Sequence, residues 1–283
     1  MSIQKVGVVG AGTMGNGIAQ ACAMAGLQVM MIDVSETAAL TGKKSIDASL
    51  GRLVNKDKLS AADRAACLSR VHTSVDYASL ADADLVIEAA TENVGTKLRI
   101  LEKIDAVIAA NAIIATNTSS ISITQLAAVL KRPSDFLGMH FFNPVPVMVL
   151  LEVIRGLQTS EDTHARALQF AQQIGKVPIS AKNSPGFAVN RILVPMINEA
   201  IFVLQEGLAT AEDIDAGMRL GCNHPIGPLA LADLIGLDTL LAVMQVFYEG
   251  FNDPKYRPAP LLKEMVAAGR IGRKAGGGFY SYS

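Results

Sequence analysis

Cysteines are scarce in this sequence, and their positions exclude two kinds of site. The 283 residues include three cysteines, Cys22, Cys67 and Cys222, which lie far apart and form no C-x-x-C pair. This spacing predicts neither a disulfide framework nor a zinc site, and it favours a reducing compartment.

The chain also lacks an excess of charge of either sign. Its 25 Lys and Arg residues nearly balance 26 Asp and Glu residues, which gives a formal net charge of −1. We therefore expect no nucleic acid and no membrane as a partner. An anionic ligand must be bound by groups close to its own site. The longest apolar stretch, residues 226–247, contains Asp233 and Asp238, and it predicts a buried helix instead of a membrane span.

No segment typical of a signal or transit peptide precedes the first expected strand. That strand begins almost at Met1, so we expect a cytoplasmic protein. Half of the residues are apolar, and the length suffices for two domains and a large core.

A glycine-rich turn follows the first hydrophobic run. Residues 6–9 lead into a G-x-G-x-x-G segment, Gly10-Ala-Gly12-Thr13-Met14-Gly15. Asp33 ends the next hydrophobic run, residues 27–32. A strand, this motif, a helix and a carboxylate, in that order, are the context that a dinucleotide-binding βαβ unit requires. The alternative is a glycine turn in a sheet protein that binds no nucleotide.

Each glycine of this unit has a defined use in binding a dinucleotide. Gly10 permits the tight turn, Gly12 lets the backbone approach the pyrophosphate, and Gly15 allows close packing of helix against strand. The pyrophosphate would then face the positive end of the helix. We expect Asp33 to bond the ribose hydroxyls and to repel the extra phosphate of NADP, so the pocket should prefer NAD or NADH.

Strand patterns then alternate with helical patterns. The alternation returns at Val71, and further strands are expected at residues 85–87, 112–115, 137–139 and 150–154. It predicts an α/β fold, a Rossmann-type doubly wound, mostly parallel sheet with helices on both faces. A charged helical excursion at about residues 37–70 could reach over a ligand.

From Asn183 the alternation stops and a helical series follows. We place a domain boundary there, with a Rossmann-type NAD-binding domain at residues 1–183 and an all-helical domain at residues 184–283. Several apolar helical faces in the second half suggest that one face is buried in another subunit.

Polar residues cluster where the expected strands end, which is where open α/β sheets bind their ligands. They include Glu88, Glu92, Asn117, Ser119, His140, Asn143 and Glu152. A histidine can take the proton of an alcohol while hydride leaves the same carbon, and a carboxylate on its other nitrogen fixes the tautomer. His140 and Glu152 suit these roles. Spacing alone leaves open a core histidine bonded to backbone and a solvated strand carboxylate.

Six segments together carry a resemblance to a known family. They are GAGTMG at residues 10–15, IEAATE at 87–92, NTSS at 117–120, MHFFNP at 139–144, NSPGF at 183–187 and GP at 227–228. With them the chain resembles the 3-hydroxyacyl-CoA dehydrogenases from end to end, and most of all the bacterial single-function (S)-3-hydroxybutyryl-CoA dehydrogenases. The resemblance implies reversible, NAD-dependent oxidation of an (S)-3-hydroxyacyl-CoA to the 3-ketoacyl-CoA. It also implies a homodimer formed through a helical substrate and dimerisation domain.

The resemblance assigns individual residues to catalysis. It makes His140 and Glu152 an acid–base dyad, Ser119 the group that bonds the substrate oxygen, and Asn190 the amide near the thioester and the reacting carbonyl. Structural alternatives remain for two of them. Ser119 could cap a helix, and Asn190 could bond backbone within its own helix.

The same resemblance assigns residues to the two ligands. Those implied for NAD are Gly10, Gly12, Thr13, Met14, Gly15, Asp33, Glu92, Lys97, Asn143 and Lys274. Those implied for the acyl-CoA are Ser119, Asn190, Ser49 and Lys56, the last in a locally basic patch that suits a polyanion. Lys97 and Lys56 could instead be ordinary solvated lysines. The chain departs from the family in its tail, where Gly277 stands in place of a charged or polar residue.

Two other functions fit part of the pattern. A dehydrogenase of a free hydroxy acid or sugar acid would share the βαβ unit and the HFFNP segment, but it would not need the basic residues Arg52 and Lys56. A non-catalytic NAD-binding structural protein, of the kind recruited as a lens crystallin, would not need an intact pair of His140 and Glu152. We therefore expect an enzyme that acts on a CoA thioester.

Overall fold

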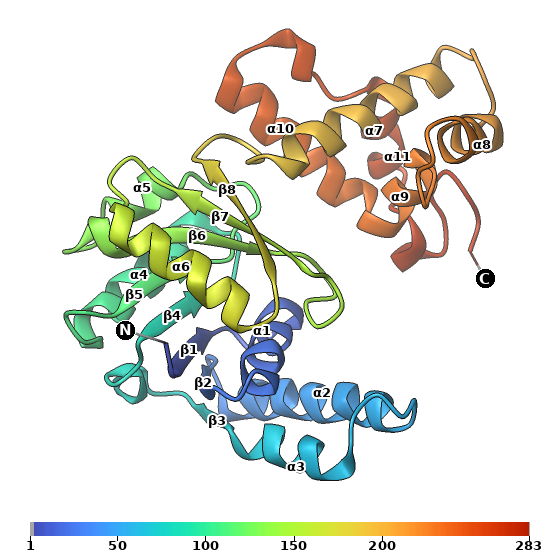
Figure 1. The fold of residues 1–283 in the computed structure, drawn as a ribbon. Helices are drawn as coiled ribbons and strands as arrows, with labels where there is room; N and C mark the ends of the chain where they lie inside the picture. Colours follow the sequence, from blue (N-terminus) through green and yellow to red (C-terminus); the bar gives the residue numbers. More distant parts are fainter. Residues whose placement is uncertain (1–2, 283) are drawn as a thin grey trace. The chain divides into compact units, whose positions relative to one another are not determined.

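The computed structural model describes residues 3–282, which form two compact units (Figure 1). The first unit ends at Asn183 and the second begins at Ser184. The first is built on a β-sheet and the second is helical. Each unit has a hydrophobic core of its own.

The first unit contains a sheet of eight strands in the order β3-β2-β1-β4-β5-β6-β7-β8. The strands are β1 (Lys5–Val9), β2 (Gln28–Ile32), β3 (Val71–Ser74), β4 (Leu85–Glu88), β5 (Ile113–Thr116), β6 (Phe136–Phe141), β7 (Leu150–Arg155) and β8 (Val177–Lys182). Neighbouring strands are parallel except β6 and β7, which are antiparallel. The predicted fold class, a Rossmann-type, mostly parallel sheet followed by an all-helical domain, is confirmed.

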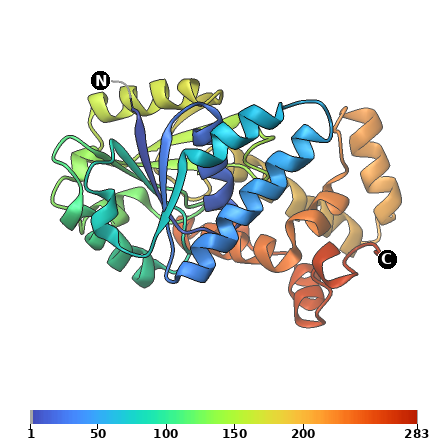
Figure 2. The same cartoon turned by 90° about the horizontal axis from the view of Figure 1, so that it is seen from below.

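Helices connect most of these strands. In the described part of this unit they are α1 (Thr13–Met24), α2 (Glu36–Val54), α3 (Ala61–Ser69), α4 (Val94–Val107), α5 (Ile123–Ala127) and α6 (Glu161–Gln173), with short 3-10 turns at Tyr77–Leu80 and Pro133–Asp135. The helices α2 and α3 lie side by side, in blue and cyan in Figure 2, and occupy the segment where a charged helical excursion was expected.

Both faces of the sheet are covered, because alternate strand residues point to opposite sides. On one face, Val8 of β1 shares a core with Ile18 of α1 and Phe170 of α6. On the other face, α5 packs so closely that a Cβ on Gly138 would lie 2.8 Å from the Cδ1 atom of Ile123. Such double coverage is what a mostly parallel sheet requires.

The starts of the helices in this unit follow ordinary capping rules with one exception. The helices α2 to α6 each begin with a side chain that accepts a hydrogen bond from a backbone N–H group: Ser35, Ser60, Asn93, Ser122 and Ser160. Among the described residues of the unit, α1 alone starts without a capping side chain, at Gly12. The first N–H groups of α1 are therefore available to another acceptor.

The sheet differs from the sequence-based expectation in two places. Strand β8 was not expected, because its side chains are exposed or half-buried and form no hydrophobic run, as suits the edge of a sheet. Strand β6 continues to Phe141, so His140 lies within the strand and not after it.

The second unit packs five α-helices, counted over its described residues, around one core. They are α7 (Val189–Gln205), α8 (Ala211–Gly221), α9 (Pro228–Ile235), α10 (Leu237–Phe251) and α11 (Pro260–Ala267). The apolar stretch expected as one helix is two, because α9 and α10 bend by 97° at Gly236, whose φ of 100° suits glycine. Within residues 3–282, no single helix is long and apolar enough to span a membrane, and only this bent pair passes that test when taken together.

Two buried aspartates fix the C-terminal tail to these helices. Asp233 of α9 accepts a bond from the Tyr280 N–H group at 2.9 Å, and Asp215 of α8 accepts one from the Tyr280 hydroxyl group at 2.9 Å. Burial and the bond to Asp215 raise the pKa of Tyr280. The tail that contains the unusual Gly277 is therefore anchored within the second unit.

Candidate active site

The carboxyl ends of β1 and β4 lie where the strand order reverses. From β1 the chain passes outward to β2 and β3, whereas β4 pairs with β1 on its other side. Open α/β sheets bind ligands at such a switch point, beyond the carboxyl ends of the strands. The groups at the ends of β1, β2, β4, β5 and β6 therefore define the candidate site.

The turn after β1 has the geometry of a dinucleotide-binding loop. Gly10 has a φ of 105°, and its N–H group donates to the Ile32 carbonyl oxygen at 2.7 Å. A Cβ on Gly15 would lie 1.7 Å from the Gly10 carbonyl oxygen, so the helix approaches the turn as only glycine allows. A Cβ on Gly12 would meet no atom within 4 Å, so that position is open.

Thr13 and Met14 form the first turn of α1 beside this open position. The uncapped N–H groups and the helix dipole make this end of α1 suitable for an anion such as a pyrophosphate. The structure thus brings the five predicted residues of the motif into one anion-binding turn.

Asp33, at the end of β2, faces the same turn. Its Oδ2 atom accepts a bond from the Ala11 N–H group at 2.6 Å, and its Oδ1 atom accepts one from the Val34 N–H group at 2.7 Å. The carboxylate is therefore held in a fixed orientation beside the glycine turn.

A pocket of about 350 Å³ lies between this carboxylate and α4. Its lining includes Gly10, Asp33, Tyr77, Ala90, Arg99 and Lys103. Neither Arg99 nor Lys103 was predicted as a site residue, although their i, i+4 spacing puts both on one face of α4. The lining of this pocket therefore contains two cations as well as the aspartate carboxylate.

His140 and Glu152 face each other across neighbouring antiparallel strands. They are paired in the register of β6 and β7, and the His140 Nδ1 atom lies 2.7 Å from the Glu152 Oε2 atom. The glutamate is fully buried, whereas 7% of the histidine surface is exposed. When Glu152 is ionised, its carboxylate can only accept a hydrogen bond, which places the hydrogen on Nδ1 and makes Nε2 the basic nitrogen. The spacing in the sequence did not show whether His140 and Glu152 touch. In the structure they do, and Glu152 is not a solvated carboxylate.

Glu92, which follows β4, binds the loop that follows β5. Its Oε1 atom accepts bonds from the Ser119 N–H group at 2.8 Å and the Ser119 hydroxyl at 3.1 Å. Its Oε2 atom accepts a bond from the Thr118 hydroxyl at 2.7 Å. Ser119 does not cap α5, because Ser122 does. Two residues predicted for different ligands are thus bonded to each other.

Lys97 is not the ordinary solvated lysine that the sequence left open. The side chain is fully buried, and its ammonium group forms an ion pair with Glu88 and lies 3.2 Å from the Thr116 hydroxyl. The Thr116 hydroxyl donates to the same glutamate oxygen at 2.7 Å. Lys97 is therefore not a solvated lysine. Its expected contact with the cofactor stays a prediction.

Asn117 joins the ends of three strands, a role that was not predicted. Its N–H group donates to the Glu88 carbonyl oxygen at 2.7 Å, and its Oδ1 atom accepts a bond from the Phe141 N–H group at 2.9 Å. Because Phe141 follows His140, this amide fixes the end of the strand that carries the histidine. In the sequence, the place of Asn117 directly after a buried strand is the feature that could have indicated this role.

The predicted coenzyme A residues lie on the helical excursion. Ser49 is half-buried on α2, and Lys56 is exposed in the turn that follows it. Asn143 is exposed just after β6.

Two predicted residues belong to the second unit. Asn190 lies in the first turn of α7. Lys274 bonds to Asp238 of α10, with 2.7 Å between the nitrogen and the carboxylate. Within its own unit, Lys274 is therefore part of a surface ion pair.

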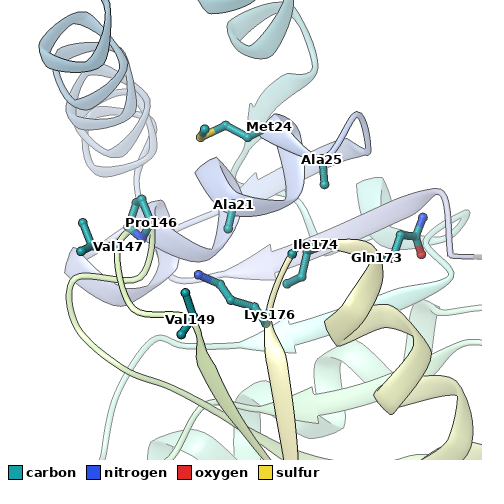
Figure 3. A pocket seen from close by; sticks show the side chains of 10 residues that line it. Ala21, Met24, Ala25, Pro146, Val147, Val149, Gln173, Ile174 and Lys176 are labelled. Carbon is teal, nitrogen blue, oxygen red and sulfur yellow. The ribbon is translucent and has the colours of Figure 1, made fainter. Parts of the chain in front are cut away.

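A second pocket of about 350 Å³ lies beside the loop that follows Asn143 (Figure 3). Lys176 is buried there, and its ammonium group donates to the carbonyl oxygens of Val145 and Met148, the latter at 2.7 Å. Burial lowers the pKa of this lysine. The loop is thus held by a cation whose hydrogen-bond partners are backbone carbonyls.

A dinucleotide-binding turn and a histidine–glutamate pair on one sheet edge are the arrangement of a nicotinamide-dependent dehydrogenase. Comparison with protein families agrees with this class. The model described as "3-hydroxyacyl-CoA dehydrogenase, NAD binding domain" matches residues 5–184, and "3-hydroxyacyl-CoA dehydrogenase, C-terminal domain" matches residues 186–282. The chain belongs to the 3-hydroxyacyl-CoA dehydrogenase family, and its cofactor is NAD.

Individual relatives match along nearly their whole length. A probable 3-hydroxybutyryl-CoA dehydrogenase of Deinococcus radiodurans is 50% identical over 278 residues, which covers 98% of this chain and 100% of that protein. A 3-hydroxybutyryl-CoA dehydrogenase of Bradyrhizobium diazoefficiens is 50% identical over 280 residues, or 99% and 96% of the two chains. The crystal structure of an (S)-3-hydroxybutyryl-CoA dehydrogenase from Ralstonia eutropha superposes with a TM-score of 0.98 at 63% identity and covers 100% of both chains.

Proposed function

We propose that this protein catalyses the reversible oxidation of an (S)-3-hydroxyacyl-CoA, with 3-hydroxybutyryl-CoA as the preferred substrate, to the 3-ketoacyl-CoA with NAD. The observation that carries the proposal is the buried pair of His140 and Glu152, 2.7 Å apart, on the ligand-binding edge of an NAD-binding domain. Full-length relatives named 3-hydroxybutyryl-CoA dehydrogenase support the four-carbon substrate.

His140 is the acid–base group of this mechanism. In the oxidation, its Nε2 atom takes the proton of the 3-hydroxyl group as hydride leaves C3. NAD supplies the hydride acceptor when it is bound at the glycine turn. Glu152 keeps the Nδ1 hydrogen in place and stabilises the imidazolium that forms. In the reverse reaction, the protonated histidine returns its proton to the developing alkoxide.

Ser119 and Asn190 bind the substrate as neutral dipoles. Neither side chain titrates near neutral pH, and the Asn190 amide can donate to a substrate oxygen in both directions of the reaction. The Ser119 hydroxyl has one hydrogen, which it donates to Glu92 in this structure, so it must turn from that carboxylate to donate to a substrate oxygen. The backbone N–H group and the hydroxyl of Ser119 both donate to Glu92, which fixes their orientation. This carboxylate supports the placement of the serine at the substrate.

The cofactor residues are divided along the site. Gly10, Gly12, Thr13, Met14 and Gly15 bind the pyrophosphate, Asp33 binds the adenosine ribose, and Glu92 and Asn143 lie toward the nicotinamide end, with Lys274 contributed by the tail. The open Gly12 position and the fixed carboxylate of Asp33 support this division. Ser49 and Lys56 bind the phosphate-bearing part of coenzyme A, because Lys56 is an exposed cation beside a helix.

The assembly that fits this function is a homodimer formed through the C-terminal helices. Large exposed apolar side chains on the second unit support such an interface: Ile192, Leu208, Leu220 and Leu234. We place the enzyme in the cytoplasm, which agrees with three cysteines that form no disulfide.

The loss of NADH absorbance with acetoacetyl-CoA tests this function, when repeated with NADPH and with free acetoacetate. We expect rapid NADH oxidation with the thioester alone. Turnover of the free acid at an equal rate would instead favour a dehydrogenase of free hydroxy acids. Ser49 and Lys56 would then have no role in binding coenzyme A. NADH binding without turnover of any 3-ketoacyl-CoA would favour a structural protein.

A further inference from the structure

We infer that Phe142 is a positioning residue for the reaction, because its ring packs against the imidazole of His140 and holds that imidazole in the orientation that proton transfer requires. The inference rests on the proposed function, since it concerns the histidine that moves the proton. Phe142 was not expected among the site residues, although it stands only two positions after His140.

The first step is the contact between the two rings. The centroids of the His140 and Phe142 rings lie 4.6 Å apart, and the ring planes meet at 50°. At this separation two aromatic rings touch. His140 lies in β6, and Phe142 directly follows the last residue of that strand. Residues two positions apart in an extended chain point to the same side of it, so strand geometry accounts for the contact.

The second step is the effect of this contact on the imidazole. The Glu152 carboxylate lies 2.7 Å from Nδ1 and fixes the place of that nitrogen. Rotation about the Cβ–Cγ bond of a histidine has only broad preferences, so packing must set the plane of the ring. The Phe142 ring limits the tilt of the imidazole on the side where it lies. Nε2 is then held in one direction, as efficient proton transfer requires.

The third step is the support of Phe142 itself. On its N-terminal side, the Phe141 N–H group donates to the Asn117 Oδ1 atom at 2.9 Å. On its C-terminal side, Val145 is buried, and its carbonyl oxygen accepts a bond from the Lys176 ammonium group. The backbone is therefore anchored on both sides of Phe142, and its ring has a fixed base.

The fourth step is the small part that Phe142 has in the core. Its side chain is half-buried, whereas Phe136, at the start of the same strand, is fully buried. The removal of apolar surface from water explains a phenylalanine such as Phe136. A phenyl ring that stays partly exposed gains less from burial, so its contact with His140 explains Phe142 better than stability does.

The test compares Phe142→Leu with Phe136→Leu, the same change at the other end of β6. Phe142→Leu should lower kcat with acetoacetyl-CoA by about 3- to 10-fold, the size of effect expected when an aromatic pair is lost. The KM for acetoacetyl-CoA and the dissociation constant of NADH should stay as in the wild type, because the contact acts on proton transfer and not on binding. Phe136→Leu should lower the melting temperature and leave kcat unchanged. Single-turnover measurements of NADH oxidation prevent slow product release from hiding the effect.

A conservative variant shows whether the ring itself is needed. Phe142→Tyr keeps an aromatic ring and should retain a kcat close to that of the wild type. Phe142→Met keeps only an apolar side chain and should behave like Phe142→Leu. It also serves as the test if Phe142→Leu does not fold. A tyrosine variant as slow as the leucine variant would overturn the inference.

NMR spectra of isotope-labelled histidine report the contact without turnover. The chain has four histidines, and a spectrum of His140→Ala identifies the ring signal that belongs to His140. In Phe142→Leu this signal should move, because the neighbouring aromatic ring that shifts it is gone. In Phe136→Leu it should keep its position. A signal that does not move in Phe142→Leu would overturn the inference.

The kinetic outcomes separate positioning from contact with the substrate. An unchanged kcat in folded Phe142→Leu would overturn the inference. A raised KM with an unchanged kcat would overturn it as well, since it would show that the ring binds the substrate. Failure of the wild type to reduce acetoacetyl-CoA would contradict the proposed function, and the histidine signal would still test the contact between the two rings.

Discussion

Two buried pairs of a basic side chain and a carboxylate lie near the carboxyl ends of the sheet strands, and they differ in their exposure to solvent. In one pair, His140 is 7% exposed and Glu152 is fully buried. In the other pair, both Lys97 and Glu88 are fully buried. The first pair is therefore partly open to solvent, whereas the second pair is not.

The secondary structure around each pair explains this difference. His140 and Glu152 are cross-strand neighbours, so the sheet register alone brings them together. Lys97 reaches Glu88 from a helix that covers one face of the sheet, and its position depends on helix packing. In this protein the pair within the sheet leaves His140 partly exposed, whereas the pair between helix and sheet is fully buried.

The largest expected effect separates chemistry from stability at the first pair. His140→Ala and Glu152→Gln should lower turnover by about two to four orders of magnitude, because a positioned acid–base group is lost. NADH affinity should stay near the wild-type value. Steady-state kinetics with acetoacetyl-CoA and a fluorescence titration measure the two quantities. A parallel loss of NADH binding would show that this pair also supports the cofactor site.

Substitutions at the second pair should change the stability of the protein. Lys97→Met leaves the Glu88 carboxylate buried without its cation, and the free energy of unfolding should fall by about 3–5 kcal/mol. Replacing both residues with Lys97→Met and Glu88→Leu should recover much of that loss. Urea unfolding followed by circular dichroism measures both variants. Equal destabilisation by the single and double changes would show that the charges do not depend on each other.

A third carboxylate, Asp33, is half-buried and therefore more exposed than either pair. Asp33→Gly should weaken NADH binding and shift the preference toward NADPH by about 10-fold, because the repulsion of the extra phosphate disappears. The nearby cations Arg99 and Lys103 line the same pocket and should strengthen that shift. The ratio of kcat/KM for the two cofactors is the measurement, with Asp33→Asn as a control that removes only the charge. An unchanged ratio would contradict the assignment of Asp33.

The smallest effect concerns Lys176, a buried lysine held by carbonyls. Its pKa is lowered by burial, so between that value and the ordinary 10.5 the unfolded chain binds a proton that the folded chain does not. The free energy of unfolding should therefore rise with pH in that window, and Lys176→Met should lack this rise.

Cys22 supplies the control for this pH dependence. Burial raises its pKa to about 12 from 9.0, so its contribution to stability falls as pH rises above 9.0. Lys176 itself lowers the pKa of Cys22 by its charge, so wild type and Lys176→Met are compared in a Cys22→Ala background, which removes the thiol contribution from both proteins. A difference that does not change with pH would show that Lys176 is uncharged or charged equally in both states.

The dinucleotide-binding turn could be predicted from the sequence because its causes are local. Gly10 and Gly15 are needed by the backbone of one short segment, and the strand, turn and helix follow one another in the chain. Strand β8 could not be predicted in this way, because its place at the sheet edge depends on its neighbour β7 and not on its own hydrophobicity.

The candidate site was predicted in part for the same reason. His140, Glu152 and Ser119 stand in recognisable segments, so their types and roles could be expected. Ser119 donates a hydrogen bond to Glu92, 27 positions away in the chain, and Phe141 donates one to Asn117, 24 positions away. Such bonds depend on which strands become neighbours, which no local pattern contains.

By itself, the sequence determined the class of fold, the cofactor and the family, since hydrophobic periodicity, glycine positions and long motifs act within short segments. Only the tertiary structure decided which polar groups are buried and paired. Lys97 looks like any helix lysine in the sequence, and only the packing of α4 on the sheet places its ammonium group against Glu88. Burial and pairing are properties of neighbours brought together across the chain, and the energy of a charge depends on those neighbours.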